Sequence, residues 1–177
     1  PLIMVNPTYL LGPGGGPTST SGRVIARFMN GRLRGFVPGA ICPVDVDDVV
    51  EGHLLAADRG RVGERYLLGG TNVTLEEFFQ LLADVAGRPP PKRLPPGVVM
   101  AAAFVLERVV APLTGKPPRH DVDEVKIARL PRLYDSTKAK TELGFRTRPL
   151  RETLERTVNW LREQGHVPAA SAAQAVG

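Results

Sequence analysis

The sequence predicts an α/β fold in which helices cover a parallel sheet. An uncharged apolar run at residues 1–5 ends at Asn6-Pro7, and a second strand-like run at residues 63–70 ends at two glycines. Strands that are buried on both faces of a parallel sheet have this apolar, turn-bounded character. Elsewhere, apolar residues recur at helical spacing. Ligands of such sheets bind at the carboxyl ends of the strands, so we expect Asn6, Pro7 and Thr8 to face a ligand crevice.

Length and composition indicate one core-forming unit. The chain has 177 residues and is 42% hydrophobic, which suffices for one ordinary domain. We assign residues 1–167 to a single incomplete domain and residues 168–177 to a disordered tail. The first strand has no preceding element to pair with. We therefore expect the chain to be the C-terminal part of a larger fold, with an exposed strand edge and poor solubility.

The charge and the cysteine content limit the kinds of ligand and the cellular compartment that we expect. The net charge is +5 and the pI is about 9.8, without a basic block that contains interleaved aromatic residues. This pattern argues against nucleic acid and favours a small phosphate-bearing ligand. Cys42 is the only cysteine, which excludes an internal disulfide and a multi-cysteine metal site and fits a cytoplasmic protein. The most apolar stretch, residues 98–106, is about half as long as a bilayer span, so nothing supports membrane association.

The glycine-rich stretch at residues 12–17 is predicted to be a loop. The pattern Gly-x-Gly-x-x-Gly would require glycine at position 17, where Pro17 stands, and the phosphate-loop lysine is missing. One of the four hydroxyl residues 18–21 is expected to cap a helix over residues 22–31, whose apolar positions recur at helical spacing.

Acidic residues mark the next two helix starts. Asp47-Asp48 follow a brief strand and could be catalytic carboxylates or metal ligands, but no second ligand cluster accompanies them, so we favour helix capping. His53 lies inside that helix and is interpreted as a satisfied residue rather than a base. Thr74 and Glu77 form the capping-box pattern.

The rest of the chain is predicted to be mainly helical. Gly87 ends the capped helix, and the proline-rich residues 88–96 form an extended connector. Further helices are expected, in chain order, over residues 98–113, 121–129, 135–144 and from Pro149 through Leu161.

Tyr134 and Lys138 have the spacing of a tyrosine acid/base and its lysine. Tyr134 precedes the expected helix start, however, so the two side chains need not share a face. We therefore predict that the pair is not catalytic. The residues alone indicate no self-contained catalytic machinery and no metal site.

Several stretches together resemble the extended short-chain dehydrogenase/reductase superfamily, the NAD(P)-dependent epimerases and dehydratases. Hopanoid-associated sugar epimerases and dihydroflavonol-reductase-like proteins are the nearest in pattern. The resemblance covers residues 1 to about 165. The matching stretches are Val5-Asn-Pro-Thr8 with Gly12-Pro13, residues 44–49, residues 64–70, and residues 135–145 with Trp160.

The resemblance implies a fold and a site. The fold would be the C-terminal part of an NAD(P)-binding Rossmann-like fold together with the helical substrate-binding lobe. Pro7 and Thr8 would contact the nicotinamide of NAD or NADP, with Thr20 or Ser21 also near the cofactor, and Asn6 would face a small-molecule substrate such as a sugar. Some members of the family are homodimers. The parent enzyme would transfer a hydride while a tyrosine moves the proton.

Departures from the family pattern limit what this chain does alone. The glycine fingerprint and the Tyr-x-x-x-Lys pair of the family lie N-terminal to the matched region, so we expect no catalytic residue here. The family often has arginine at the position of Ile41 to hold a substrate diphosphate, and isoleucine cannot pair with it. Three alternatives remain open at this point: a non-catalytic binding module, a dihydroflavonol- or steroid-type ketoreductase, and a truncated product without a cellular role.

Overall fold

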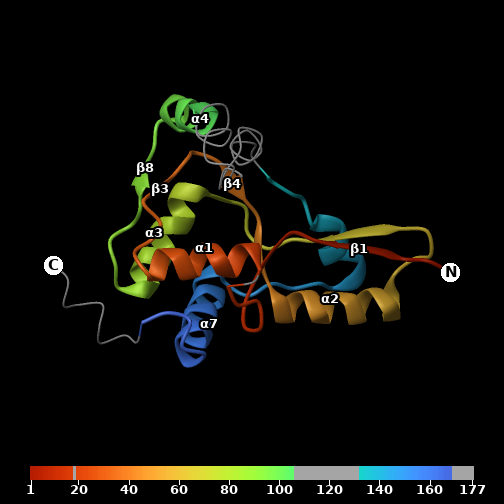
Figure 1. Ribbon diagram of the computed structural model, residues 1–177. Coiled ribbons are helices and arrows are strands. Elements are labelled where there is room, and N and C mark those ends of the chain that lie inside the picture. Colours follow the sequence, from red (N-terminus) through yellow and green to blue (C-terminus); the bar gives the residue numbers. More distant parts are fainter. Residues whose placement is uncertain (18, 106–131, 169–177) are drawn as a thin grey trace, which may run out of the picture.

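A computed structural model describes residues 1–17, 19–105 and 132–168, and Figure 1 shows how their elements are arranged. The strands are short, and the described residues contain more helix than strand. In chain order the elements are β1 Met4–Pro7, β2 Tyr9–Leu11, α1 Thr20–Met29, β3 Gly35–Phe36, β4 Ala40–Ile41, β5 Pro43–Asp45, α2 Val46–Arg59, β6 Arg65–Leu68, β7 Val73–Thr74, α3 Leu75–Ala86, β8 Lys92–Arg93, α4 Pro96–Val105, the π-helix η2 Ala139–Leu143 and α7 Leu150–Glu163.

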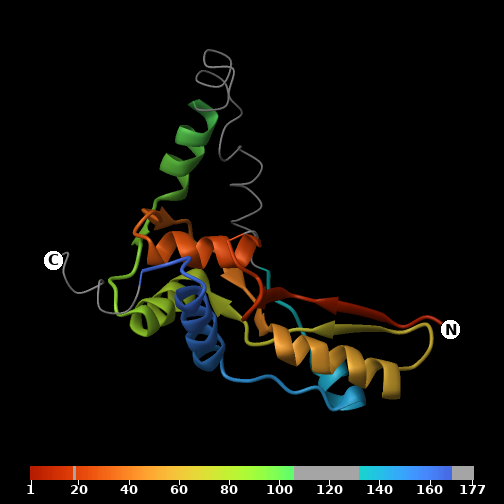
Figure 2. The same ribbon diagram turned by 60° about the horizontal axis from the view of Figure 1, so that its bottom comes forward.

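The predicted parallel pairing is confirmed. Strand β1 pairs in parallel with β6, in a register that places Pro7 opposite Leu68, and β2 pairs in parallel with β5. Helix α2 lies beside the β1–β6 pair in both views (Figures 1 and 2). In the chain this helix connects β5, which pairs with β2, to β6, which pairs with β1.

The prediction that β1 is buried on both faces is wrong. Met4, Asn6 and Pro7 are exposed, and only Ile3 and Val5 pack against the core formed by α2, β6 and η2. Within the described residues β6 is the only strand that pairs with β1. One face and one edge of β1 are therefore left uncovered, as the expected incomplete sheet requires.

A second core joins helices α1, α3 and α7, which Figure 2 shows packed together. The apolar residues at helical spacing supply it, including Ile25, Phe28, Leu82 and Leu154, all of which are buried. Helix α1 begins two residues before the predicted start, because Ser19 is the N-cap and its Oγ accepts a hydrogen bond of 3.0 Å from the Gly22 amide.

The expected capping role of Asp47 and Asp48 is not what the structure shows. The N-cap of α2 is Asp45, whose carboxylate accepts a hydrogen bond from the Asp47 amide at 2.9 Å. Asp47 and Asp48 lie in the first turn. His53 is exposed, and its Nδ1 lies 2.8 Å from the Val49 carbonyl oxygen.

Other predicted helix boundaries follow local chemistry. The Thr74–Glu77 capping box opens α3, and Gly87 ends it in the left-handed conformation. Residues 137–143 form a short helical segment that includes η2, within the predicted range of 135–144, and Gly144 with φ 76° is its C-cap. The proline-rich connector adds the strand β8, which pairs with β3. Of the predicted helix over residues 98–113, only the part to Val105 is described, as α4; the helix at 121–129 and the tail after residue 168 lie outside the described residues.

Candidate functional site

The carboxyl ends of β1 and β6 meet at Thr8. Its amide donates to the Leu68 carbonyl at 3.2 Å, and its hydroxyl donates to the Cys42 carbonyl at 2.6 Å. Thr8 thereby fixes the end of β1 against both β6 and the chain that leads into β5. Ligand sites of open parallel sheets lie at this edge.

Two glycines make this edge compact. A Cβ atom on Gly69 would lie 3.1 Å from the Cys42 Sγ, and a Cβ atom on Gly70 would lie 1.9 Å from the Pro43 carbonyl oxygen. The hydroxyl of Ser136 donates to the Gly69 carbonyl at 3.0 Å and joins the segment before η2 to the same point. At Gly70 a side chain would collide with the backbone of β5, so the chain can pass from β6 this close to β5 only with glycine there.

The structure brings three of the predicted site residues together and separates the other two. Asn6 and Pro7 are exposed at the end of β1, directly before the half-buried Thr8. Thr20 is exposed in the first turn of α1, whereas Ser21 is half-buried. Ser21 lines a cavity that Asn6, Pro7 and Thr8 do not line.

This cavity has a volume of about 390 Å³. It lies between the glycine-rich loop of residues 12–16, the start of α1 and helix α7, with Val46 and Trp160 in its wall. The loop is built from backbone conformations that favour glycine, since Gly12, Gly14 and Gly16 have φ values of 131°, 90° and 48°. The sequence predicted the loop but not the cavity, because α7 is far away in the chain.

A charged cluster at the start of α2 was missed by the sequence analysis. Asp45 is buried, and Arg156 Nη1 donates to both of its carboxylate oxygens at 3.0 Å. Arg148 Nε and its backbone amide each donate to Asp48 at 2.8 Å. Arg156 also pairs with Asp47. These contacts join the start of α2 to α7 and to the segment before it.

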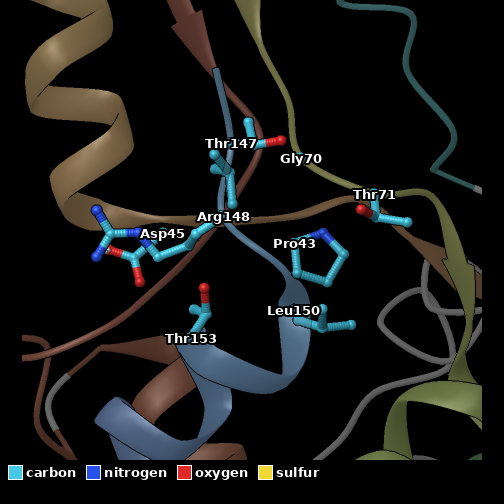
Figure 3. A pocket seen from close by; sticks show the side chains of 9 residues that line it. Pro43, Asp45, Gly70, Thr71, Thr147, Arg148, Leu150 and Thr153 are labelled. Atoms are coloured by element: carbon cyan, nitrogen blue, oxygen red, sulfur yellow. Dashed lines mark ion pairs between the residues drawn. The ribbon is translucent and has the colours of Figure 1, made fainter.

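The cluster borders a second hollow, seen from close by in Figure 3. Asp45 and Arg148 lie on one side of it, and Pro43 and Thr71 on the other. Its volume of about 10 Å³ holds no more than a water molecule. The arginines of the cluster bind aspartates that lie about 100 residues away in the sequence. We therefore interpret the cluster as a clamp that holds the start of α2 to α7 and to the segment before it, rather than as a ligand site.

Burial and the neighbouring carboxylate of Asp45 raise the pKa of Asp48 to about 6, although the Arg156 guanidinium opposes the shift. The pKa in the unfolded chain is near 3.8. Between these values the folded chain holds a proton that the unfolded chain has released. This group therefore makes the chain more stable as the pH falls through 6 towards 4, and less stable at neutral pH.

Substituting Asp48 with asparagine should remove this pH dependence. Between pH 7 and pH 4.5 the free energy of unfolding of the wild type should rise by about 2 kcal/mol relative to D48N. Urea unfolding at both pH values measures the difference. D58N is the matched control, since the Asp58 side chain is 73% exposed. Equal pH profiles for the wild type and D48N would contradict the assignment.

The Tyr134–Lys138 pair is divided between different partners. The Lys138 ammonium donates to Glu64 at 2.5 Å and lies 4.8 Å from the centre of the Tyr66 ring. Tyr134 is 40% exposed, and its backbone amide and carbonyl bond to Asn72. Lys138 is therefore engaged with Glu64 and Tyr66, and the contacts of Tyr134 to Asn72 are made by its backbone. That the pair does not act as an acid/base couple stays a prediction.

Two further observations concern the described residues only. They contain no group of three or more potential metal-binding side chains placed to hold an ion. No described helix combines the length and apolar character that a bilayer crossing requires.

Comparison with known proteins gives clear relatives, although no protein-family model matches the chain. A dihydroflavonol 4-reductase-like protein of Synechocystis sp. is 34% identical over 171 residues, which cover 94% of this chain and 50% of that protein. Sterol demethylase protein B of Methylococcus capsulatus is 35% identical over 170 residues, which cover 94% of this chain and 51% of that protein.

Solved structures agree with these relatives. A nucleoside-diphosphate-sugar epimerase from Pseudomonas aeruginosa superposes with a TM-score of 0.77 at 30% identity, covering 95% of this chain and 50% of that one. Other structures that share the fold are complexes with NAD or with NADPH. The chain spans about half the length of the proteins that it matches.

Proposed function

Because this chain belongs to the extended short-chain dehydrogenase/reductase superfamily and matches its C-terminal portion, we propose that it supplies the substrate side of an NAD(P)-dependent reductase or epimerase. The observation that carries the proposal is the exposure of Asn6 and Pro7 at the carboxyl end of β1, next to the end of β6. A second chain segment that binds the rest of the cofactor would complete the site.

The described residues fit the nicotinamide end of the cofactor. Pro7 is exposed, presents an apolar ring and has no amide N–H to satisfy. The Thr8 hydroxyl donates to the Cys42 carbonyl, so its lone pairs are left to accept a hydrogen bond from a carboxamide. The sequence has no Gly-x-Gly-x-x-Gly turn for a pyrophosphate. When bound, the nicotinamide would supply or accept the hydride.

In this proposal the chain's own residues orient the reactants. Asn6 has a donor and an acceptor in one side chain, so it can hold a substrate hydroxyl or carbonyl oxygen beside Pro7. The proposal assigns the proton transfer to a tyrosine outside this chain, because Lys138, which would have to assist Tyr134, donates to Glu64 instead. Such positioning means that the substrate and the cofactor bind with their reacting groups already oriented toward each other.

Ile41 supports a substrate without a diphosphate. It lies in β4 and packs against the core of α1, α3 and α7, so this position offers no cationic donor to a phosphate. The two curated relatives described above are named for a flavonol-type reduction and a sterol-modifying reaction, which favours an apolar hydroxyl or carbonyl substrate over a nucleotide sugar.

The test uses the protein that carries this chain in an assay of NADH and NADPH oxidation with a panel of aryl and alicyclic ketones. N6A should lower kcat/KM for the ketone at least about tenfold, because a hydrogen bond to the reacting oxygen is lost, with the KM of the cofactor unchanged. E51Q, an exposed substitution on α2, is the control. An unchanged kcat/KM in N6A, or no turnover of any ketone, would contradict the proposal.

A further inference from the structure

The cavity beneath the glycine-rich loop has properties that the proposed reaction does not use. Its volume of about 390 Å³ lies within the range of about 300–1,000 Å³ that is typical of small-molecule pockets. The residues at the end of β1 do not line it. Its lining begins two residues after Thr8, at Leu10, and continues along the loop of residues 12–16 to helix α7.

The walls of the cavity are apolar and uncharged. Leu10, Val46, Leu161 and Trp160 supply side chains, and none of the lining residues is charged. A charged ligand would lose its hydration here and find no side chain of opposite charge, which favours a neutral molecule. Leu10 is 39% exposed, which leaves one wall accessible from solvent.

The hydroxyl groups of the lining are not equivalent. Ser19 donates to the Gly16 carbonyl and accepts from the Gly22 amide as the cap of α1. Thr157 is buried and donates to the Thr153 carbonyl at 2.6 Å. Ser21 makes no side-chain hydrogen bond to the part of the chain that the structure describes, and its hydroxyl is left for a ligand.

Two parts of the lining suit a flat molecule. The indole of Trp160 is a broad apolar surface that stacks well on another ring. The loop of residues 12–16, which also lines the cavity, consists of glycines apart from Pro13, so bare backbone rather than bulky side chains forms that part of the wall.

We propose that this cavity is a second binding site, which takes a neutral polycyclic molecule with one hydroxyl or carbonyl group. The ring system packs against Trp160 and the glycine-rich loop, and the polar group bonds to Ser21. The site does not depend on the nicotinamide face at Pro7, so it can be tested in the absence of any reaction.

The probe is 2-naphthol, added to the ¹⁵N-labelled chain. Trp160 is the only tryptophan, so one indole N–H signal reports on the cavity. We expect a saturable shift of this signal in the submillimolar range. S21F fills the cavity and should weaken binding by about tenfold or more. T20F adds the same ring to the neighbouring exposed residue, which does not line the cavity, and should bind like the wild type.

A second variant keeps the proposal testable if S21F does not fold. L10D places a charge in the apolar wall at a position that is already partly exposed, and it should also weaken binding about tenfold. If the NMR spectrum of S21F lacks the signal dispersion of a folded protein, the affinity of L10D for 2-naphthol tests the proposal instead. The proposal is overturned by the absence of a saturable shift in the wild type, or by wild-type affinity in the folded cavity variants.

Discussion

Replacing Arg156 with methionine should lower the free energy of unfolding by about 3 kcal/mol. Removing one partner of a buried ion pair leaves the other charge without compensation, which typically costs about 3–5 kcal/mol. Asp45 has a fully buried side chain and would lose both hydrogen bonds from Arg156. The low end of the range is expected because Arg148 Nη1 remains 3.7 Å from Asp45.

Urea unfolding followed by circular dichroism measures this loss. R151M is the matched control: Arg151 lies on the same helix, but its pair with Asp84 is 3.7 Å long and about half exposed on both sides. That pair should contribute less than about 1 kcal/mol. Adding Asp45→Asn to R156M should recover part of the loss, since the uncompensated charge is then gone. Equal losses in R156M and R151M would refute the clamp.

Gly70→Ala should be the second strongly destabilising substitution, with a loss of about 3 kcal/mol. The new Cβ would lie 1.9 Å from the Pro43 carbonyl oxygen and 3.3 Å from the Val44 Cα. Both contacts are with backbone, so no side-chain rotation relieves them and β5 must move away from β6. Because Thr8 joins these two strand ends, the displacement would also disturb the proposed nicotinamide face.

The control for this substitution is G97A. Gly97 lies in α4, and a Cβ atom there would meet nothing within 4 Å. Alanine is the better helix former, so G97A should be neutral or stabilising by up to about 1 kcal/mol. Thermal unfolding of the two variants under identical conditions compares them. A loss in G70A of less than about 1 kcal/mol would show that the strand ends are not packed as described.

Local chemistry explains which elements could be predicted from the sequence. The α3 helix was identified because the Thr74–Glu77 capping box and the left-handed Gly87 act within a few residues. At the start of α2 three acids offer the same capping chemistry, and the backbone conformation of Asp45, φ −72° and ψ 141°, selects it over Asp47 and Asp48. That selection depends on the packing of β5 and is not visible in the sequence.

The candidate site also has a part that could be predicted from local sequence and a part that could not. Asn6, Pro7 and Thr8 could be placed at a strand end because that position follows from a single apolar run and the parallel connection. The charged clamp could not be predicted, since Arg148 and Arg156 are about 100 residues away from their partners in the chain. The cavity at Ser21 likewise depends on α7 packing next to α1.

The most direct test of the central claim is a titration of NADH fluorescence with the purified 177-residue chain, whose folded state is first verified by circular dichroism. In the proposed site Pro7 and Thr8 form the nicotinamide face, but the sequence has no Gly-x-Gly-x-x-Gly turn to hold the pyrophosphate. We therefore predict no saturable change at micromolar concentrations. Tight, saturable binding of NADH would show that the chain holds a complete dinucleotide site and would contradict the account.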